Sequence, residues 1–141
     1  MDRKKFIKNL GFIVAGGIST TVFENCASVK YLNCPIDENK IVVKKTEFKG
    51  NQFALITAEN LPAPIYLRNA DEDEYIALLT RCTHKGCSVD AYYDRLSCPC
   101  HGSEYSYSGE VISPPAKDPL MKFNVTADSG NIYIHLKEIQ Q

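Results

Sequence analysis

Residues 82–87 of this 141-residue chain read Cys-Thr-His-Lys-Gly-Cys, and residues 98–105 read Cys-Pro-Cys-His-Gly-Ser-Glu-Tyr. These two stretches hold four of the six cysteines and two of the three histidines in the chain. The first pairs a cysteine with a histidine two positions later, and the second pairs them three positions apart. Each stretch therefore offers one anionic sulfur and one neutral imidazole to a metal centre.

This donor set favours a binuclear iron–sulfur centre, in which thiolates bind one iron and imidazoles bind the other. Cys82 and His84 would come from the first loop, and Cys98 and His101 from the second. A structural zinc site is an alternative, but such sites usually have four ligands with C-x2–4-C spacing. Two disulfides beside histidines that bind nothing are a further alternative. The mixed pairs fit the iron–sulfur centre better than either.

Two cysteines are left over, Cys87 in the first loop and Cys100 in the second. A disulfide between them would hold the loops together in an oxidising compartment. Gly86 and Gly102 allow the backbone to turn tightly beside a metal, and Pro99 stiffens the second loop. The stretch therefore predicts two short loops that lie side by side.

The half-motifs C-T-H-x-G-C and C-P-C-H-G-S resemble the signature of Rieske iron–sulfur proteins, and the resemblance covers residues 80–120. It implies one [2Fe-2S] cluster per chain. It also implies that Cys82 and Cys98 bind one iron and that His84 and His101 bind the other.

The same resemblance implies that Cys87 and Cys100 form a disulfide. In Rieske proteins of respiratory complexes, hydroxyls at the positions of Ser103 and Tyr105 donate to a bridging sulfide and to a cysteine sulfur. Such hydrogen bonds, together with the neutral histidine ligands, raise the reduction potential. The resemblance therefore implies a cluster of the high-potential type. The alternative is that Ser103 only caps a turn and that Tyr105 only packs.

Residues 41–141 predict an all-β Rieske-type domain of short antiparallel strands with the two cluster loops at one tip. The acidic run 69–74 predicts a hairpin loop, and the proline-bearing segment 113–120 is expected to cover the cluster, as in Rieske proteins. His135 is expected to be an ordinary strand residue rather than a ligand. The predicted strands are 41–48, 53–57, 65–68, 75–79, a short pair within 89–96, one that follows a turn within 106–111, and then 121–125 and 132–136.

Residues 1–26 have the layout of an export signal or membrane anchor. Four basic and two acidic residues surround a fourteen-residue apolar run from Leu10 to Phe23, which is short against the ~20 residues of a spanning helix. The basic part resembles a twin-arginine signal with Lys4 in place of the second arginine. Cys26 is a candidate for lipidation, and a retained anchor or simple cleavage near it are the alternatives.

Residues 27–40 show no clear period and predict a tether. Cys34 within it either pairs with Cys26 or is a buried thiol. The net charge of −1 gives no indication of nucleic-acid binding, and the length fits one globular domain.

These features predict an exported one-electron carrier, attached to a membrane on its periplasmic side. By the resemblance, it would be the iron–sulfur subunit of a quinol-oxidising complex of the cytochrome bc type, with a quinol-oxidising membrane subunit and a c-type cytochrome as partners. Oxidoreductase activity is then expected only as part of that complex. Lys85 departs from the pattern, because bc-type subunits usually carry an apolar residue there.

Two other functions stay open. One is a small Rieske subunit or lipoprotein that relays electrons for another exported oxidoreductase, similar to the small subunit of arsenite oxidase. The less favoured one is a Rieske ferredoxin for an oxygenase, because those usually lack the cysteine pair Cys87 and Cys100. The chain is too short to hold the catalytic iron domain of a full oxygenase.

Overall fold

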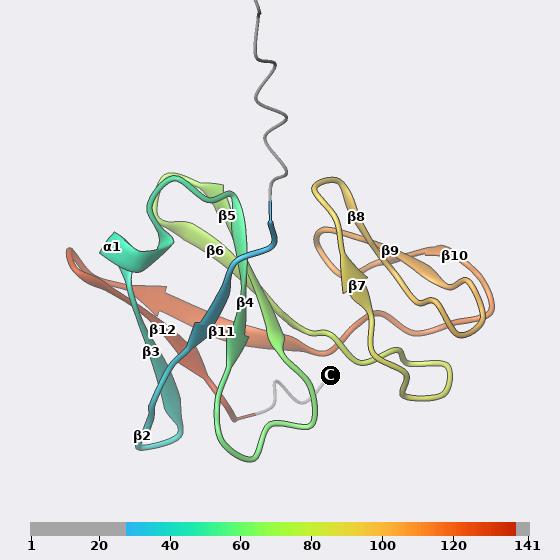
Figure 1. Cartoon of the computed structure of the whole chain (residues 1–141), viewed down its shortest axis with the longest axis horizontal. Helices are drawn as coiled ribbons and strands as arrows, with labels where there is room; N and C mark the ends of the chain where they lie inside the picture. Colours follow the sequence, from blue (N-terminus) through green and yellow to red (C-terminus); the bar gives the residue numbers. More distant parts are fainter. Residues whose placement is uncertain (1–27, 138–141) are drawn as a thin grey trace, which may run out of the picture.

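The computed structural model describes residues 28–137, which form two β-sheets with one short helix (Figure 1). The predicted signal or anchor segment, 1–26, lies outside the described residues, and so does Cys26. Among the residues that are described, no helix is long and apolar enough to cross a membrane. The all-β prediction is confirmed.

The large sheet has eight strands and curls around its own apolar core (Figure 1). All its neighbouring strands are antiparallel except β1 and β4, which run parallel. In order across the sheet the strands are β1 (Tyr31–Asn33), β4 (Phe53–Thr57), β5 (Ile65–Asp71), β6 (Glu74–Leu79), β11 (Lys122–Ala127), β12 (Asn131–His135), β3 (Lys40–Lys44) and β2 (Ile36–Asp37).

Alternation of side chains explains this core. Ile41 on β3 lies opposite Ile134 on β12, and Val43 lies opposite Ile132. All four side chains are fully buried, because every second residue of a strand faces the same side of the sheet. Branched aliphatic pairs of this kind stabilise antiparallel strands.

The small sheet has four strands of two or three residues in an antiparallel meander, β7 (Asp90–Ala91), β8 (Arg95–Ser97), β9 (Glu104–Ser106) and β10 (Val111–Ser113). Leu96 lies opposite Tyr105, and both are fully buried. They belong to a second apolar core, which also contains Tyr66 and Leu78 from the large sheet. The small sheet is therefore stabilised by packing on the large one.

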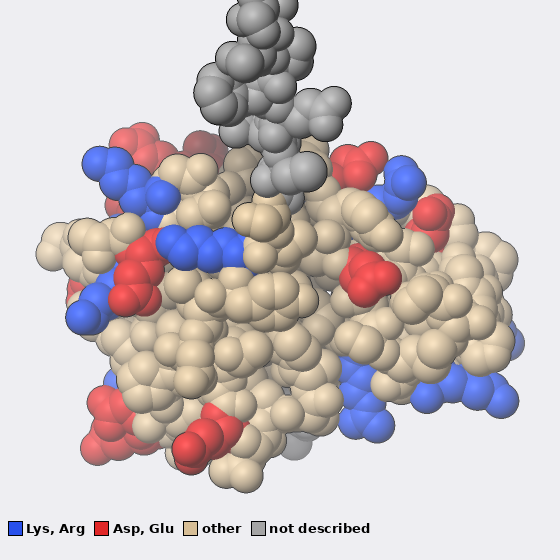
Figure 2. Space-filling view, viewed as in Figure 1, with Lys and Arg blue, Asp and Glu red and all other residues tan. Residues whose placement is uncertain are grey.

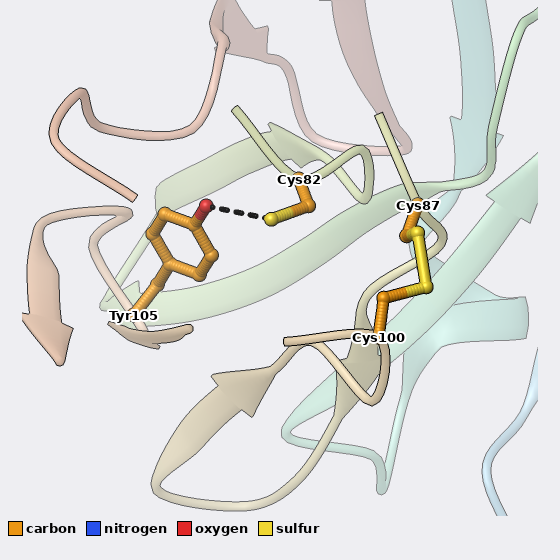
Figure 3. Close-up of a disulfide and its surroundings, with 4 residues drawn as sticks. All are labelled: Cys82, Cys87, Cys100 and Tyr105. Atoms are coloured by element: carbon orange, nitrogen blue, oxygen red, sulfur yellow. Dashed lines mark hydrogen bonds between the residues drawn. A yellow bond between two sulfur atoms is a disulfide. The ribbon is translucent and has the colours of Figure 1, made fainter. Parts of the chain in front are cut away.

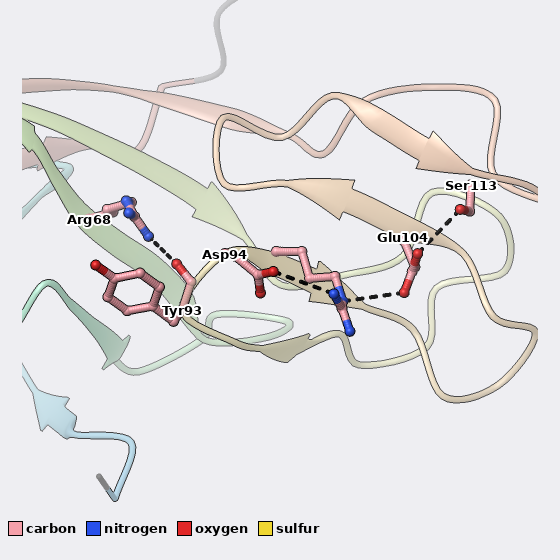
Figure 4. A network of polar contacts seen from close by, with 6 residues as sticks. Arg68, Tyr93, Asp94, Glu104 and Ser113 are labelled. Atoms are coloured by element: carbon pink, nitrogen blue, oxygen red, sulfur yellow. Dashed lines mark hydrogen bonds and ion pairs between the residues drawn. The ribbon is translucent and has the colours of Figure 1, made fainter.

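Polar contacts also join the two sheets (Figure 4). The Nη1 of Arg68 on β5 donates to the carbonyl of Tyr93 at 2.6 Å, and its guanidinium lies 4.6 Å from the ring centroid of Tyr107. Within the small sheet, Arg95 lies 3.4 Å from both Asp94 and Glu104. Arg68 therefore connects the large sheet to two turns of the small sheet.

In the small sheet, the strands β9 and β10 flank the region 106–111, where a turn and one strand were predicted. The structure also differs from the sequence prediction at three places in the large sheet. The strand predicted over 41–48 ends at Lys44, and residues Lys45–Phe48 form the helical turn α1, which places Phe48 in the core and against Tyr75. Residues predicted as tether form β1 and β2. The hairpin loop predicted over 69–74 is shorter, because β5 extends to Asp71, which pairs with Glu74.

Candidate metal centre

Two loops of the same backbone design lie side by side next to the small sheet. The first follows β6, where the N–H of Cys82 donates to the carbonyl of Cys87 and the N–H of Gly86 donates to Cys82. The second follows β8, with the same pattern between Cys98, Ser103 and Gly102. Gly86 and Gly102 have φ values of 78° and 81°, a conformation that glycine adopts without strain. The predicted tight turns are confirmed.

A disulfide between Cys87 and Cys100 joins the two loops (Figure 3). This pairing agrees with the prediction. The sulfurs of Cys87, Cys98 and Cys100 lie within 4.8 Å of one another. Because the first and third are oxidised, only Cys98 of these three offers a thiolate to a metal.

Cys82 and Cys98 are free thiols that are 3% and 1% exposed. Burial, the largest single influence, raises the pKa of Cys82. Hydrogen bonds from Tyr105, the backbone of His84, Cys98 and Ser103 together outweigh it, so the pKa of Cys82 is lower than usual.

The pKa of Cys98 is raised, first by burial and then by its hydrogen bond to Cys82 and the negative charge there, while backbone N–H groups of Cys100 and His101 act in the opposite direction. Ionised Cys82 is therefore close enough to hinder the ionisation of Cys98. A cation between them would relieve this repulsion, because both could then be thiolates.

The two histidines also come together. The rings of His84 and His101 lie 5.0 Å apart at their centroids, edge to face. His101 is exposed and His84 is partly exposed, so both imidazoles lie at the surface. The structure thus places two buried sulfurs and two accessible imidazoles on adjacent loops.

Tyr105 reaches the first loop from the small sheet (Figure 3). Its hydroxyl lies 3.2 Å from the sulfur of Cys82 and accepts the N–H of Thr83 at 3.1 Å. The Thr83 hydroxyl donates to the carbonyl of Asp118 at 2.7 Å and also lies 3.0 Å from the Tyr105 hydroxyl. Since the only proton of the Thr83 hydroxyl goes to Asp118, Tyr105 is the donor of this pair, and its proton can point to the Thr83 oxygen or to an ionised Cys82 sulfur.

The proline-bearing segment contacts both loops. The Ser103 hydroxyl accepts the N–H of Ala116 at 2.9 Å, and Asp118 bonds to Thr83 as described. Ser103 is completely buried, and because its oxygen accepts from Ala116, its hydroxyl proton is available to the Cys82 sulfur. The segment therefore closes a third side of the site.

The sequence prediction missed Thr83 as a member of the site. Only its position between Cys82 and His84 could have indicated this role, because its hydrogen-bond partners, Tyr105 and Asp118, are distant in the sequence. His135 is a β12 residue bonded to the hydroxyl of Thr126, as expected. Cys34 is buried and is a free thiol within residues 28–137.

The donor set fits the [2Fe-2S] group that the motif implies. Two free thiols at the base of the loops suit one iron, and two imidazoles at the surface suit the other. Backbone N–H groups of His84, Cys100 and His101 already bond to the cysteine sulfurs, as expected for thiolate ligands. No nitrogen donor other than the two imidazoles is needed.

Comparison with known sequences gives the same assignment. The chain is 29% identical, over 149 aligned residues, to the cytochrome b6-f complex iron-sulfur subunit of Chlorobaculum tepidum, covering 96% of this chain and 76% of the relative. A shorter match, 46% identical over 55 residues, links it to the chloroplastic subunit of the same name from Bigelowiella natans; it covers 38% of this chain and 22% of the relative.

Among solved structures, the plasma membrane Rieske protein PetC3 from Synechocystis superposes with a TM-score of 0.54 at 26% identity, covering 64% of this chain and 93% of that protein. Residues 29–124 match the Rieske [2Fe-2S] domain, which is more than half of the chain. The chain therefore belongs to the Rieske [2Fe-2S] domain family.

Proposed function

We propose that this chain is the one-electron carrier of a membrane-bound quinol-oxidising complex, and that Cys82, Cys98, His84 and His101 are the ligands of its cluster. The observation that carries the proposal is the pairing of two buried free thiols with two surface imidazoles on disulfide-joined loops. The bound cluster supplies a site that accepts and releases one electron at a time.

The positions of the ligands suit this role. Cys82 and Cys98 are buried, so the protein excludes water from the sulfur side. The exposed His101 and the partly exposed His84 leave the imidazole side open to a partner. By this proposal, an imidazole ligand there also takes the proton of quinol at the ring nitrogen that does not bind iron.

Hydrogen bonds around the sulfurs support a high reduction potential. Tyr105 and the buried Ser103 are both placed to donate to the Cys82 sulfur. Donors of this kind stabilise the more negative, reduced state. We assign to both residues the tuning role that the sequence predicted.

Names of relatives support membership of a quinol-oxidising complex. One relative, of which the chain covers 76%, is an iron–sulfur subunit of a cytochrome b6-f complex. By this proposal, a quinol-oxidising membrane subunit gives an electron to this chain, and a c-type cytochrome accepts it.

Export and membrane attachment are part of the proposal. The disulfide between Cys87 and Cys100 supports an oxidising compartment. Residues 1–26 would act as export signal or anchor, with Cys26 as the position for a lipid if the segment is cleaved there. The strands β1 and β2 place the start of the folded domain before residue 41.

A second candidate function rests on Lys85. This residue is exposed between His84 and Gly86, on the surface that an electron partner must approach. A cation there suits a small Rieske subunit that relays electrons for another exported oxidoreductase with an acidic contact surface.

Purification from native membranes separates these functions. Co-purification with b-type and c-type cytochromes, and quinol-dependent reduction of the cluster, would support the first. Co-purification with a different oxidoreductase would support the second, and a soluble, cytoplasmic chain would contradict both.

A further inference from the structure

The three segments that form the tip of the domain carry a net positive charge. The two loops and the proline-bearing segment, residues 81–88, 98–103 and 113–119, carry three basic residues and one acidic residue. All the other described residues carry nine basic and thirteen acidic residues. The tip is therefore cationic on a domain that is otherwise anionic.

Two of these cations belong to the first loop. The Nε of Arg81 lies 3.1 Å from the point where a Cβ would sit on Gly86, so the guanidinium packs directly against the loop. Lys85 is exposed next to His84. The loop that carries His84 therefore has one guanidinium packed against it and one exposed ammonium.

The third cation lies in the proline-bearing segment. Lys117 precedes Asp118, whose carbonyl is bonded to Thr83, so the backbone holds Lys117 next to the first loop. None of Arg81, Lys85 and Lys117 forms an ion pair within residues 28–137. Their charge is available to an external partner.

The acidic residues lie elsewhere. The β5–β6 turn carries Asp71, Glu72, Asp73 and Glu74, and Lys45 ties Asp73 to the helical turn α1. This turn lies at the opposite end of the molecule from the loop between β6 and β7 (Figure 1). Figure 2 shows basic side chains, without acidic ones beside them, along the lower right edge, where that loop lies.

We propose that the tip around His84 and His101 is a cationic docking surface, and that the redox partner binding there presents an acidic surface around its own cofactor. The proposal deepens the proposed function and rests on it, because it needs the cluster at this tip. Opposite charges steer such partners into register and raise the association rate, and salt screens this effect.

The field at the tip can be measured with inorganic oxidants of opposite charge. The reduced full-length protein gives one electron to hexacyanoferrate(III), which becomes hexacyanoferrate(II), or to tris(phenanthroline)cobalt(III), which becomes the cobalt(II) complex. We expect the rate with the anionic oxidant to fall about threefold as ionic strength rises from about 0.01 to about 0.5 M, and the rate with the cationic oxidant to rise.

The net charge of the whole chain makes this a sharp test. Since the chain has a net charge of −1, its overall charge predicts the opposite salt dependence for both oxidants. An anionic-oxidant rate that rises with salt, or that does not change, would overturn the proposal. The two oxidants differ in driving force, which changes their absolute rates. The comparison therefore uses the change of each rate with ionic strength.

Charge-reversal variants locate the effect. Lys85→Glu and Lys117→Glu should abolish or reverse the salt slope with hexacyanoferrate(III). Lys49→Glu is the matched control, because Lys49 is exposed, follows α1 and changes the net charge equally. If Lys49→Glu altered the slope as strongly as Lys85→Glu, the effect would be one of net charge and the proposal would be wrong.

Polyglutamate can stand in for the acidic partner surface. At low ionic strength it should slow oxidation of the native protein and of Lys49→Glu, but not of the double variant Lys85→Glu/Lys117→Glu. Equal inhibition of all three would also overturn the proposal. The EPR spectrum of the reduced cluster is recorded for each sample: its absence from the native protein would refute the proposed function, whereas its presence with the wrong salt slope would refute only the docking surface.

Discussion

The large and small sheets of this protein are stabilised in different ways. The large sheet has strands of up to seven residues, and its core is built mainly from aliphatic side chains that alternate along each strand. The small sheet has strands of two or three residues, and its core mixes aliphatic side chains with Cys82, Cys98 and Tyr105. The difference shows that the scaffold depends on local patterning, while the site depends on contacts between distant residues.

The largest expected effect comes from replacing a cluster ligand. The cluster should then be lost while the large sheet stays folded. Cys98→Ser replaces a buried thiol with a hydroxyl, which is a poor ligand for iron. We expect loss of bound iron and of the reduced-state EPR spectrum, with far-UV circular dichroism unchanged. Cys34→Ser is the matched control, because it also replaces a buried free thiol. Retention of the cluster in Cys98→Ser would refute the ligand assignment.

Next in size is a change in the core of the large sheet. Ile134→Ala removes a fully buried side chain opposite Ile41 and should cost about 4 kcal/mol of unfolding free energy. Ile36→Ala on β2, where the side chain is 40% exposed, should cost about 1 kcal/mol or less. Urea unfolding of both variants gives the comparison. Equal costs would contradict the assignment of the core.

Removal of the disulfide should affect mainly the small sheet. The bond links residues 13 positions apart, so the variant Cys87→Ser/Cys100→Ser should lose about 3 kcal/mol of local stability. We expect the cluster to be released at a lower temperature, as measured by visible circular dichroism. If the midpoint temperature of unfolding measured by far-UV circular dichroism fell by the same amount, the two sheets would unfold as one unit instead.

A smaller effect concerns the hydrogen bond between Tyr105 and Cys82. Tyr105→Phe removes a donor to the sulfur while keeping the buried ring. The loss should lower the reduction potential by roughly 40 mV, which corresponds to about 1 kcal/mol for one electron. Redox titration followed by EPR measures it, and Tyr107→Phe, whose ring is 45% exposed, is the control. An unchanged potential in Tyr105→Phe would contradict the tuning role.

The smallest expected effect lies in the turn between β11 and β12. Tyr133 and the backbone N–H groups of Gly130 and Asn131 hold the pKa of Asp128 below its usual value. The carboxylate therefore adds stability above its unfolded pKa of about 4, and this contribution is lost as the pH falls through the lower folded value.

Asp128→Asn should accordingly be slightly less stable than the native protein at pH 7. The difference should disappear in strongly acidic solution, where both side chains are neutral. Urea midpoints at the two pH values test this. A difference that persists unchanged at low pH would mean that the charge of Asp128 contributes nothing.

Prediction from the sequence worked where neighbouring residues decide the outcome. The strands at 53–57, 75–79 and 132–136 were predicted within one residue at each end, because alternation or an apolar run marks them. It failed for Phe48, which reaches the core through the helical turn α1 instead of a strand. It also failed for β1, which is a strand only because it pairs with β4.

By itself, the sequence determined the donor types and the all-β class, because the spacing of cysteine and histidine and the alternation of apolar residues are local properties. Only the tertiary structure decided how Tyr105, Thr83 and Asp118 meet beside Cys82, and how Lys117 comes next to the loop that carries Arg81 and Lys85. Hydrogen bonds and electric fields depend on distance in space, and residues 35 positions apart in the chain, such as Thr83 and Asp118, come within bonding distance only after folding.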